Sequence, residues 1–318
     1  MNPSSVVHVA VGVLINSSGE VLISLRHPDS HQGGLWEFPG GKLEAGEEPR
    51  AALKREFAEE LGVKVCRCFP LKKIQYDYPD KSVLLDIWRI VESTGTPKGL
   101  EGQAVEWRAI SDLKESDFPA ANAPIINCLK LPAEIAITPN VSNFGELQQI
   151  IHTLLNNGVR LIQFRQTELS AVEYLRWFEW ADQRCSAGGV KLMFNQKLAD
   201  FPVATAAGYH ASANRLMQLQ QRPLSHSQLF SASCHNLNQL QQAQRLEADF
   251  VYLSPVHPTA KYPDGRELGW EGFQKLVEQS SVPVYALGGV ARNELAIAQA
   301  HGGFGISGIR CFLNSALG

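Results

Sequence analysis

The sequence predicts two domains of different class, an α+β sandwich over residues 1–131 and an α/β barrel over residues 134–318. A length of 318 residues is sufficient for two domains of ordinary size. The first part places β-rich runs around a single helical segment that is rich in glutamate. After residue 131, short β runs alternate regularly with helical segments, which is typical of a parallel barrel.

The overall composition is that of an ordinary soluble protein and excludes several functional classes. Hydrophobic residues make up 44% and charged residues 19%, and the net charge is −3, so no basic surface for duplex nucleic acid is expected. No apolar run approaches the length of a membrane span, and the N-terminus lacks the pattern of a secretory signal. The six cysteines are scattered, so we expect free thiols in a reducing cytoplasm rather than a zinc site.

Five β-rich runs and two helices are expected in the first domain. Residues 6–15 and 20–26 form the first two strands, separated by the turn-forming stretch Asn16-Ser17-Ser18-Gly19. Further elements are expected as strands at residues 64–78, 82–91 and 104–110, and as a helix at 123–129. Two helices against a mixed sheet form an α+β sandwich.

The first helix is expected between Pro49 and Gly62. Proline suits a first helical turn, where its missing N–H is not needed, and glycine readily ends a helix. Leu53, Phe57 and Leu61 form an apolar stripe that is suited to pack on a sheet.

The same helix carries a cluster of like charges. Glu56, Glu59 and Glu60 share one face because they are three or four residues apart. A hard cation such as Mg²⁺ or Mn²⁺ would convert their repulsion into binding, since it prefers carboxylate oxygens and shares coordination with phosphates. Arg55 lies one turn before Glu59 and is placed to orient it. We therefore expect a metal site rather than a merely solvated acidic helix.

The residues around this helix resemble a known signature. Within residues 33–63, Gly41 is followed after five residues by Glu47, and after seven more by Arg55-Glu56-Phe57, then Glu59-Glu60 and Gly62. This spacing resembles the Nudix box at every fixed position. The resemblance implies a pyrophosphohydrolase with a Nudix fold.

Further stretches narrow the resemblance to the MutT branch of that family. They are LWEFPGGK, GLEGQAVEW and DFPAANAPII, and the likeness extends over nearly all of residues 5–130. MutT-type enzymes hydrolyse oxidised purine nucleoside triphosphates such as 8-oxo-dGTP to the monophosphate and pyrophosphate, so a nucleoside triphosphate is the implied substrate.

The resemblance also implies a set of metal ligands. Glu56, Glu59, Glu60 and Glu101, with the carbonyl of Gly40, would hold Mg²⁺ or Mn²⁺. The catalytic carboxylates would be Glu56, Glu59 and Glu101. Either Glu56 or Glu101 would act as the base on the attacking water, and the sequence does not choose between them.

Four residues are implied to bind the nucleotide. Asn122 would read the purine edge with an amide that both donates and accepts. Phe38 would line the base pocket, while Arg26 and Lys42 would contact the nucleotide. Three of them have a structural alternative that the sequence leaves open. These alternatives are core packing for Phe38, a surface position for Arg26 and a helix N-cap for Asn122.

Eight strands and intervening helices are expected in the second domain, which predicts a TIM barrel. Helical segments include residues 144–155, 171–184 and 237–246. The strand candidates are residues 134–138, 160–165, 191–195, 208–211, 229–234, 249–254, 283–287 and 303–307.

This half resembles thiamine-phosphate synthases and their TenI-type relatives. The strings that carry the likeness are LIQFRQ, LMFNQ, GYHASA, SASCHN, ADFVYLSPVHPTAK, VYALGGV and GFGISGIR. The resemblance implies that a thiamine-type phosphate binds through residues at the ends of the strands, where TIM barrels hold phosphate on backbone N–H groups. These residues are Arg165, Gly288, Gly289, Gly308 and Ile309.

The barrel also departs from the synthase pattern. Thr167 stands where the synthases carry a lysine, two residues after the barrel arginine, Arg165. Gln196 stands where they carry an aspartate, directly after Asn195. The second aspartate of the synthases is absent between His210 and Asn214. Without these carboxylates, a magnesium pyrophosphate substrate is hard to hold.

Four other barrel residues keep side chains that are able to do acid–base work, namely His210, His235, His257 and Lys261. We nevertheless expect a degenerate, ligand-binding barrel with weak or no synthase activity.

Three functions follow from these observations. The first is a MutT-type 8-oxo-dGTP diphosphatase that carries a degenerate barrel. The second is a bifunctional thiamine-pathway enzyme, whose first half removes a pyrophosphorylated pyrimidine while the barrel makes thiamine phosphate. The third makes the barrel a sensor that binds a phosphate ligand and regulates or tethers the hydrolase.

Overall fold

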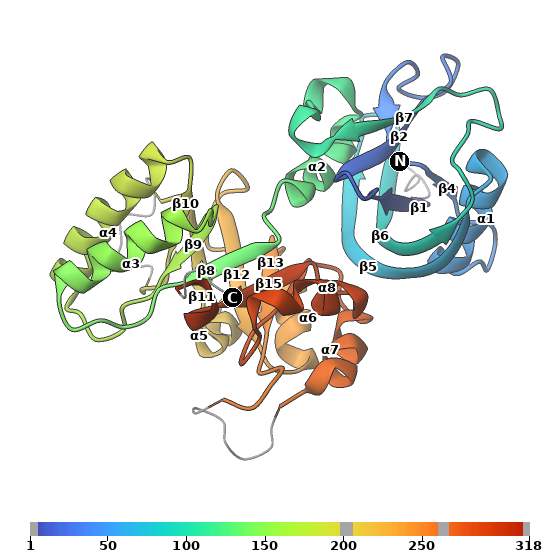
Figure 1. Cartoon of the computed structure of the whole chain (residues 1–318). Coiled ribbons are helices and arrows are strands. Elements are labelled where there is room, and N and C mark those ends of the chain that lie inside the picture. Colours follow the sequence, from blue (N-terminus) through green and yellow to red (C-terminus); the bar gives the residue numbers. More distant parts are fainter. Residues whose placement is uncertain (1–5, 198–205, 260–266, 314–318) are drawn as a thin grey trace. The chain divides into compact units, whose positions relative to one another are not determined.

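The structure is a computed structural model of the chain, and it describes residues 6–197, 206–259 and 267–313. The chain divides into two units, Met1–Leu131 and Pro132–Gly318. Each unit has its own sheet system and its own buried apolar residues (Figure 1).

The first unit contains two sheets. Its strands are β1 (Val7–Leu14), β2 (Glu20–Leu25), β3 (Trp36–Glu37), β4 (Gly40–Lys42), β5 (Lys64–Asp77), β6 (Ser82–Thr94) and β7 (Val105–Ala109). The larger sheet has the order β4-β1-β6-β5, in which β1 and β6 run parallel and the other neighbours run antiparallel. The smaller sheet has the antiparallel order β3-β2-β7.

Helix α1 (Pro49–Leu61) packs on the larger sheet through its apolar stripe. Leu53, Phe57 and Leu61 are fully buried in one core cluster with residues of β1 and β5. Gly62, with a φ of 67°, ends the helix and donates its N–H to the carbonyl of Ala58 at 3.2 Å. The expected start, stripe and end of this helix are confirmed.

The other elements of the first unit agree with expectation except for two short strands. Helix α2 (Ala123–Leu129) matches its predicted range, and the five predicted strands are present with small shifts at their ends. β3 and β4 were not predicted, because segments of two and three residues are too short to show an alternating pattern. Short 3₁₀ helices connect β7 to α2, at Ile110–Asp112, Glu115–Asp117 and Ala120–Asn122.

The second unit is a closed barrel of eight parallel strands. The order around the barrel is the order along the chain, so the last strand pairs with the first. The strands are β8 (Glu134–Ile137), β9 (Leu161–Phe164), β10 (Lys191–Phe194), β11 (Gly208–Ala211), β12 (Leu229–Cys234), β13 (Phe250–Leu253), β14 (Val284–Ala286) and β15 (Gly305–Gly308). All eight predicted strands are confirmed.

Six helices of the described residues accompany these strands. They are α3 (Phe144–Asn156), α4 (Ala171–Ala187), α5 (Ala213–Gln218), α6 (Leu237–Arg245), α7 (Gly269–Val277) and α8 (Leu295–Ala300). The side chains of Asn143 and Ser170 cap the first two, and Ser170 forms a reciprocal capping box with Glu173.

Candidate functional site

Both glycines of strand β4 lie close to a neighbouring element, Gly41 to helix α1 and Gly40 to strand β1. A Cβ atom on Gly41 would collide with the carboxylate of Glu56, and one on Gly40, whose φ is 149°, would collide with the carbonyl of Ala10. The carboxylate of Glu56 therefore lies directly against β4 at Gly41, the residue that follows Gly40, whose carbonyl was expected to bind metal.

Arg55 is the centre of an ion-pair network on α1. Its Nη1 donates to Glu56 at 2.8 Å and to Glu59 at 3.2 Å, while its Nε and Nη2 donate to the two carboxylate oxygens of Glu47 at 3.1 and 3.0 Å. Nη2 also donates to the carbonyl of Lys42 at 3.1 Å. These hydrogen bonds lower the pKa of Glu47 and raise that of Arg55. Arg55 thus orients two of the expected metal ligands and ties α1 to β4.

A distant segment brings Glu101 to the end of α1. The N–H groups of Lys98 and Leu100 donate to the carbonyls of Leu61 and Glu60 at 3.1 and 2.8 Å. The Gln103 side chain joins the same two regions, accepting from the N–H of Glu101 at 2.9 Å and donating to the carbonyl of Glu60 at 3.1 Å. Residues separated by some forty positions in sequence are therefore held as one site.

The carboxylates at this site repel one another. Burial raises the pKa of Glu60 to about 8, and the negative charges of Glu56, Glu101, Glu37 and Glu59 add to that shift. Within residues 6–197, 206–259 and 267–313, no three His, Cys, Asp or Glu side chains already form a metal-binding group. The residues nevertheless fit a hard divalent cation, because several carboxylates share a partly buried place where Arg55 is the neighbouring countercharge.

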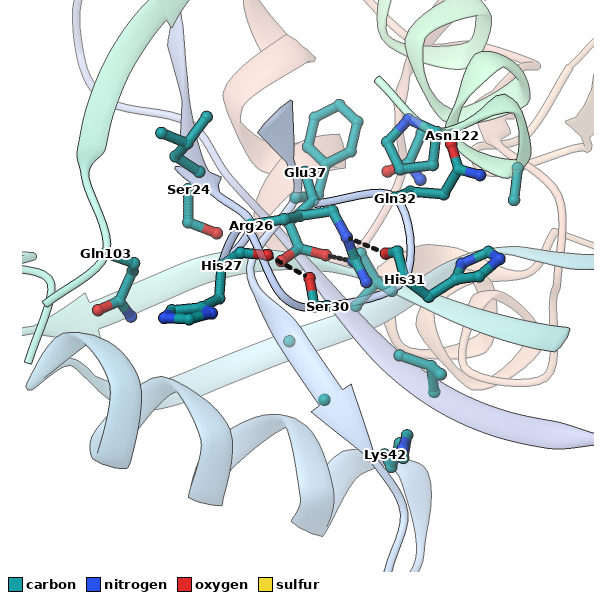
Figure 2. A pocket seen from close by; sticks show the side chains of 18 of the residues that line it. Ser24, Arg26, His27, Ser30, His31, Gln32, Glu37, Lys42, Gln103 and Asn122 are labelled. Atoms are coloured by element: carbon teal, nitrogen blue, oxygen red, sulfur yellow. Dashed lines mark hydrogen bonds and ion pairs between the residues drawn. The ribbon is translucent and has the colours of Figure 1, made fainter. Parts of the chain in front are cut away.

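A cavity of about 540 Å³ extends from these carboxylates. Its wall includes Asn122 together with the expected metal-site and nucleotide residues Gly40, Lys42, Glu60 and Glu101. In Figure 2, Lys42 and Asn122 lie at opposite ends of the view, with Arg26 between them. This volume falls within the range of pockets for small ligands, so the cavity is large enough for a nucleotide.

Arg26 and Glu37 form an ion pair within the cavity wall. Arg26 donates to the Glu37 carboxylate, and its Nε donates to the carbonyl of His31 at 3.0 Å (Figure 2). Burial raises the pKa of Glu37, and the positive charge of Arg26 opposes this shift. A free surface position for Arg26 is excluded, since the side chain is about one-quarter exposed and bound on two sides.

The side-chain amide of Asn122 lines the cavity and does not cap helix α2. Asn122 stands at the N-cap position of α2 but makes no capping hydrogen bond, so the N-cap alternative is wrong. Its side chain is 9% exposed and lines the cavity. Phe38 also lines the cavity while being buried and stacked on Phe118, with ring centroids 5.5 Å apart. The core and pocket alternatives for Phe38 therefore coexist.

Two contributors to this site were not expected from sequence. Gln103 acts through a hydrogen bond to Glu60 in helix α1, far earlier in the chain. No local sequence pattern reveals such a contact. Glu37 is a further carboxylate beside the cluster, and only its place directly before Phe38 in the glycine-rich segment hinted at a site residue.

In the barrel, Thr167, which stands where the synthases carry lysine, and the preceding Gln166 bind other parts of the chain. Gln166 is buried, donates to the carbonyl of Pro139 at 2.6 Å and accepts from the N–H of Val141 at 3.2 Å. Thr167 accepts from the Asn140 side chain at 2.8 Å. The backbone of Arg165 is fixed by Thr138, with an N–H to hydroxyl distance of 2.8 Å. These bonds join the loops after β8 and β9.

The paired glycines after β14 lie against the loop after β13. Gly288 and Gly289 have φ values of 93° and 71°, and a Cβ on either would press on Pro255 or His257. Gly308 closes β15, and Ile309 immediately precedes the 3₁₀ turn Arg310–Phe312. The candidate phosphate residues thus lie at the ends of β9, β14 and β15, as the sequence order implied.

The barrel histidines are engaged with the protein itself. His210 is 2% exposed, and its two ring nitrogens lie 2.8 Å from the hydroxyls of Ser231 and Ser233. Burial lowers its pKa to about 3, so an acid–base role for His210 near neutral pH is wrong. His235 Nδ1 lies 2.7 Å from the carbonyl of Ser254, and His257 Nε2 lies 2.9 Å from Glu294. Lys261 lies outside the described residues.

Within the described part of the chain, no helix has the length and apolar character needed to cross a lipid bilayer. All six cysteines are free thiols, as expected.

Comparisons with known proteins assign both units. Residues 10–128 match the family model of the NUDIX domain, and residues 135–312 match the model described as thiamine monophosphate synthase. The 8-oxo-dGTP diphosphatase of Escherichia coli (strain K12) is 40% identical over 122 residues, which are 38% of this chain and 95% of that protein. Its counterpart in Haemophilus influenzae is 36% identical over 124 residues, 39% of this chain and 91% of that protein.

The second unit has relatives of its own. The thiamine-phosphate synthase of Caldivirga maquilingensis is 26% identical over 185 residues, which are 57% of this chain and 90% of that protein. The predicted fold classes, a Nudix sandwich followed by a TIM barrel, are thereby confirmed. The chain belongs to the NUDIX family through its first unit and to the thiamine monophosphate synthase family through its second.

Proposed function

We propose that the first unit hydrolyses oxidised purine nucleoside triphosphates, converting 8-oxo-dGTP to 8-oxo-dGMP and pyrophosphate. One observation carries the proposal: a single cavity is lined both by the carboxylates Glu60 and Glu101 and by the Asn122 amide. This arrangement suits a ligand with a polyphosphate at one end and a hydrogen-bonding base at the other. The two 8-oxo-dGTP diphosphatases described above support the choice of base.

The reaction depends on divalent cations, for which Mg²⁺ or Mn²⁺ is the proposed choice. The residues that would hold them are the Gly40 carbonyl, Glu56, Glu59, Glu60 and Glu101. When bound, the cations supply positive charge for the triphosphate and increase the acidity of a coordinated water. The mutual repulsion of the carboxylates around Glu60 supports this assignment.

The hydrolysis itself is an in-line displacement. The oxygen of water attacks the β-phosphorus, and the bond from that phosphorus to the α–β bridging oxygen breaks, which leaves 8-oxo-dGMP and pyrophosphate. A carboxylate accepts the proton of the attacking water. The two candidates for this role are Glu56, which pairs with Arg55 and lies against β4, and Glu101, which lines the cavity.

Recognition of the nucleotide is assigned to the rest of the cavity. Asn122 would donate to and accept from the purine edge, and Phe38 would form the apolar floor of the base site. Arg26 and Lys42 would contact the nucleotide, Lys42 from β4 near the carboxylates. An amide that is nearly buried discriminates strongly between bases, because a wrong partner leaves it unpaired.

The test is a pyrophosphate-release panel on the full chain with Mg²⁺ or Mn²⁺. The substrates are 8-oxo-dGTP, dGTP, 8-oxo-dGDP and hydroxymethylpyrimidine pyrophosphate. We expect the highest kcat/KM on 8-oxo-dGTP and a smaller preference over dGTP in Asn122→Ala. Equal rates on dGTP and 8-oxo-dGTP would remove the sanitation function while leaving a Nudix hydrolase.

A cytoplasmic location is part of the proposal. It is supported by six free thiols, which persist in a reducing compartment, and by the nucleotide substrate. Localisation of a tagged full-length chain by cell fractionation tests it.

For the second unit, we propose binding of a thiamine-type phosphate without efficient synthase turnover. The glycine pair after β14 leaves backbone N–H groups near the strand ends, while Gln166 and Thr167 are used to join two loops. Thermal stabilisation of the full chain by thiamine phosphate, and its loss in Arg165→Ala, would support this function. Absence of any shift would exclude it.

A further inference from the structure

The β5–β6 hairpin places one tyrosine between two other segments of the cavity wall. Tyr78 lies just beyond β5, and its N–H donates to the carbonyl of Lys81 at 2.8 Å to close the hairpin. The hydroxyl accepts a hydrogen bond from the N–H of Ala121 at 3.3 Å. Tyr78, Ala121 and the adjacent Asn122 all line the cavity.

The bond to Ala121 acts on the short turn that presents Asn122. This turn, Ala120–Asn122, is a single 3₁₀ turn in which the Asn122 N–H donates to the carbonyl of Pro119 at 2.8 Å. No hydrogen bond joins the Asn122 amide group itself to another described residue, so its position depends on its backbone. The Tyr78 hydroxyl is the side-chain group that holds this backbone from the hairpin.

The ring of Tyr78 also contacts a second segment of the cavity wall, at His31. Its centroid lies 4.9 Å from the imidazole of His31 in an edge-on arrangement, and His31 Nε2 lies 3.4 Å from Asp80 of the same hairpin. The carbonyl of His31 accepts from Arg26. Gln32, which follows, has a φ of 61° and also lines the cavity. The hairpin therefore supports both the Asn122 turn and the His31 loop.

We propose that Tyr78 is a positioning residue for base selection, acting through its hydroxyl on the backbone of Asn122. This inference rests on the proposed function, in which Asn122 reads the purine edge. Removal of the hydroxyl leaves the Ala121 N–H without that partner and loosens the turn. The carboxylates between Gly40 and Glu60 are on other elements and stay unchanged. The loss therefore falls on base binding and not on the rate of the bound complex.

The experiment compares five forms of the full chain: wild type, Tyr78→Phe, Tyr76→Phe, Asn122→Ala and the double variant Tyr78→Phe/Asn122→Ala. Tyr76 is the matched control, because its ring lies 4.7 Å from Tyr78 outside the residues that line the cavity. Calorimetry measures the Kd of 8-oxo-dGMP and dGMP, and steady-state kinetics measure kcat and KM for 8-oxo-dGTP. Melting temperatures check that each form is folded.

We expect Tyr78→Phe to raise the Kd of 8-oxo-dGMP about three- to tenfold with kcat nearly unchanged, as the loss of one hydrogen bond implies. Tyr76→Phe should match the wild type. In the Asn122→Ala background, Tyr78→Phe should add nothing, because the two act in series. An additive effect in the double variant, a fall in kcat at constant KM, or a Kd within twofold of wild type would overturn the positioning role.

These outcomes separate the inference from the proposed function. If the wild type binds 8-oxo-dGMP no better than dGMP, base selection itself is absent and the proposed function fails. If the wild type discriminates and Tyr78→Phe discriminates equally well, only the role of Tyr78 fails.

Discussion

The two units differ in what their polar side chains bind. In the first unit, five glutamates lie close enough to repel one another; Arg55 pairs with two of them, Glu56 and Glu59, and Arg26 pairs with Glu37. In the barrel, the residues at comparable strand ends are bound to the chain itself, as Gln166 is to the loop after β8 and His210 is to two serines.

The two units therefore differ in how much free energy their polar groups would gain on binding a ligand. Uncompensated charge makes a site that gains free energy when a cation and a polyphosphate bind. A polar group that already has its partners must lose them before it binds anything else, which costs about 1–3 kcal/mol for each buried group. The glutamates of the first unit therefore favour binding of a cation and a polyphosphate. Gln166 and His210 of the barrel instead stabilise the fold through the partners that they already have.

The largest expected effect comes from removing one carboxylate of the glutamate cluster in the first unit. Glu59→Gln or Glu56→Gln should lower kcat for pyrophosphate release by about 10³-fold or more, since a carboxylate of the cluster is lost. Folding should be preserved, because the amide has the same shape. Glu48→Gln is the control, as Glu48 is exposed at the helix start and makes no capping bond. Near-normal turnover by Glu59→Gln would refute the assigned site.

The next effect tests the countercharge. Arg55→Lys should lower kcat/KM by about ten- to a hundredfold, because an ammonium cannot bind Glu47, Glu56 and Glu59 together as the planar guanidinium does. Circular dichroism and steady-state kinetics check fold and rate. Arg50→Lys, on the same helix, is the control and should retain activity. Equal loss in both variants would mean that helix stability, and not alignment, is responsible.

A smaller effect concerns the barrel and its pH dependence. Folded His210 stays neutral down to about pH 3, whereas the unfolded chain protonates it near 6.5. Between these values the unfolded state binds more protons, so this contribution is complete above pH 6.5 and is lost as the pH falls. The loss is up to about 1.4 kcal/mol per pH unit.

Hydrogen exchange of β11 to β13, corrected for the intrinsic rate at each pH, measures this slope. His210→Gln should flatten it, while replacement of the exposed His226 by Gln should leave it unchanged. A slope that survives in His210→Gln would assign the effect to other groups.

The smallest expected signal is thiamine phosphate synthesis by the barrel. The full chain carrying Glu59→Gln, which prevents hydrolysis by the first unit, is incubated with hydroxymethylpyrimidine pyrophosphate, thiazole phosphate and Mg²⁺. We expect no thiamine phosphate above the level of a protein-free control. Clear product, or rescue of a thiamine auxotroph, would instead establish the bifunctional enzyme.

The fold was largely predictable from the sequence because its signals are local. The α1 stripe of Leu53, Phe57 and Leu61 repeats at helical spacing, and the eight barrel strands are short β runs at regular intervals. β3 and β4 escaped prediction, since their few residues are defined by pairing with β2 and β1 rather than by their own pattern.

The site was predictable only in part, because its remaining members depend on tertiary contacts. The spacing of Glu56, Glu59 and Glu60 predicts that three carboxylates share one face of a helix. The spacing does not show that Gln103 joins Glu101 to that helix, or that Arg55 binds three carboxylates. Asn122 illustrates the limit, since its N-cap position suggested a cap that the side chain does not make.

The contacts of residues 98–103 with the end of α1 have a consequence for synthesis on the ribosome. A nascent chain that has emerged only as far as Leu61 contains the three helix glutamates but lacks Glu101 and Gln103. The final carbonyls of α1 gain their partners only after the whole β5–β6 hairpin has been made and folded back. The proposed hydrolytic centre therefore forms late in the synthesis of its domain, and a truncated first unit that ends before Gln103 would lack the side chain that joins this segment to α1.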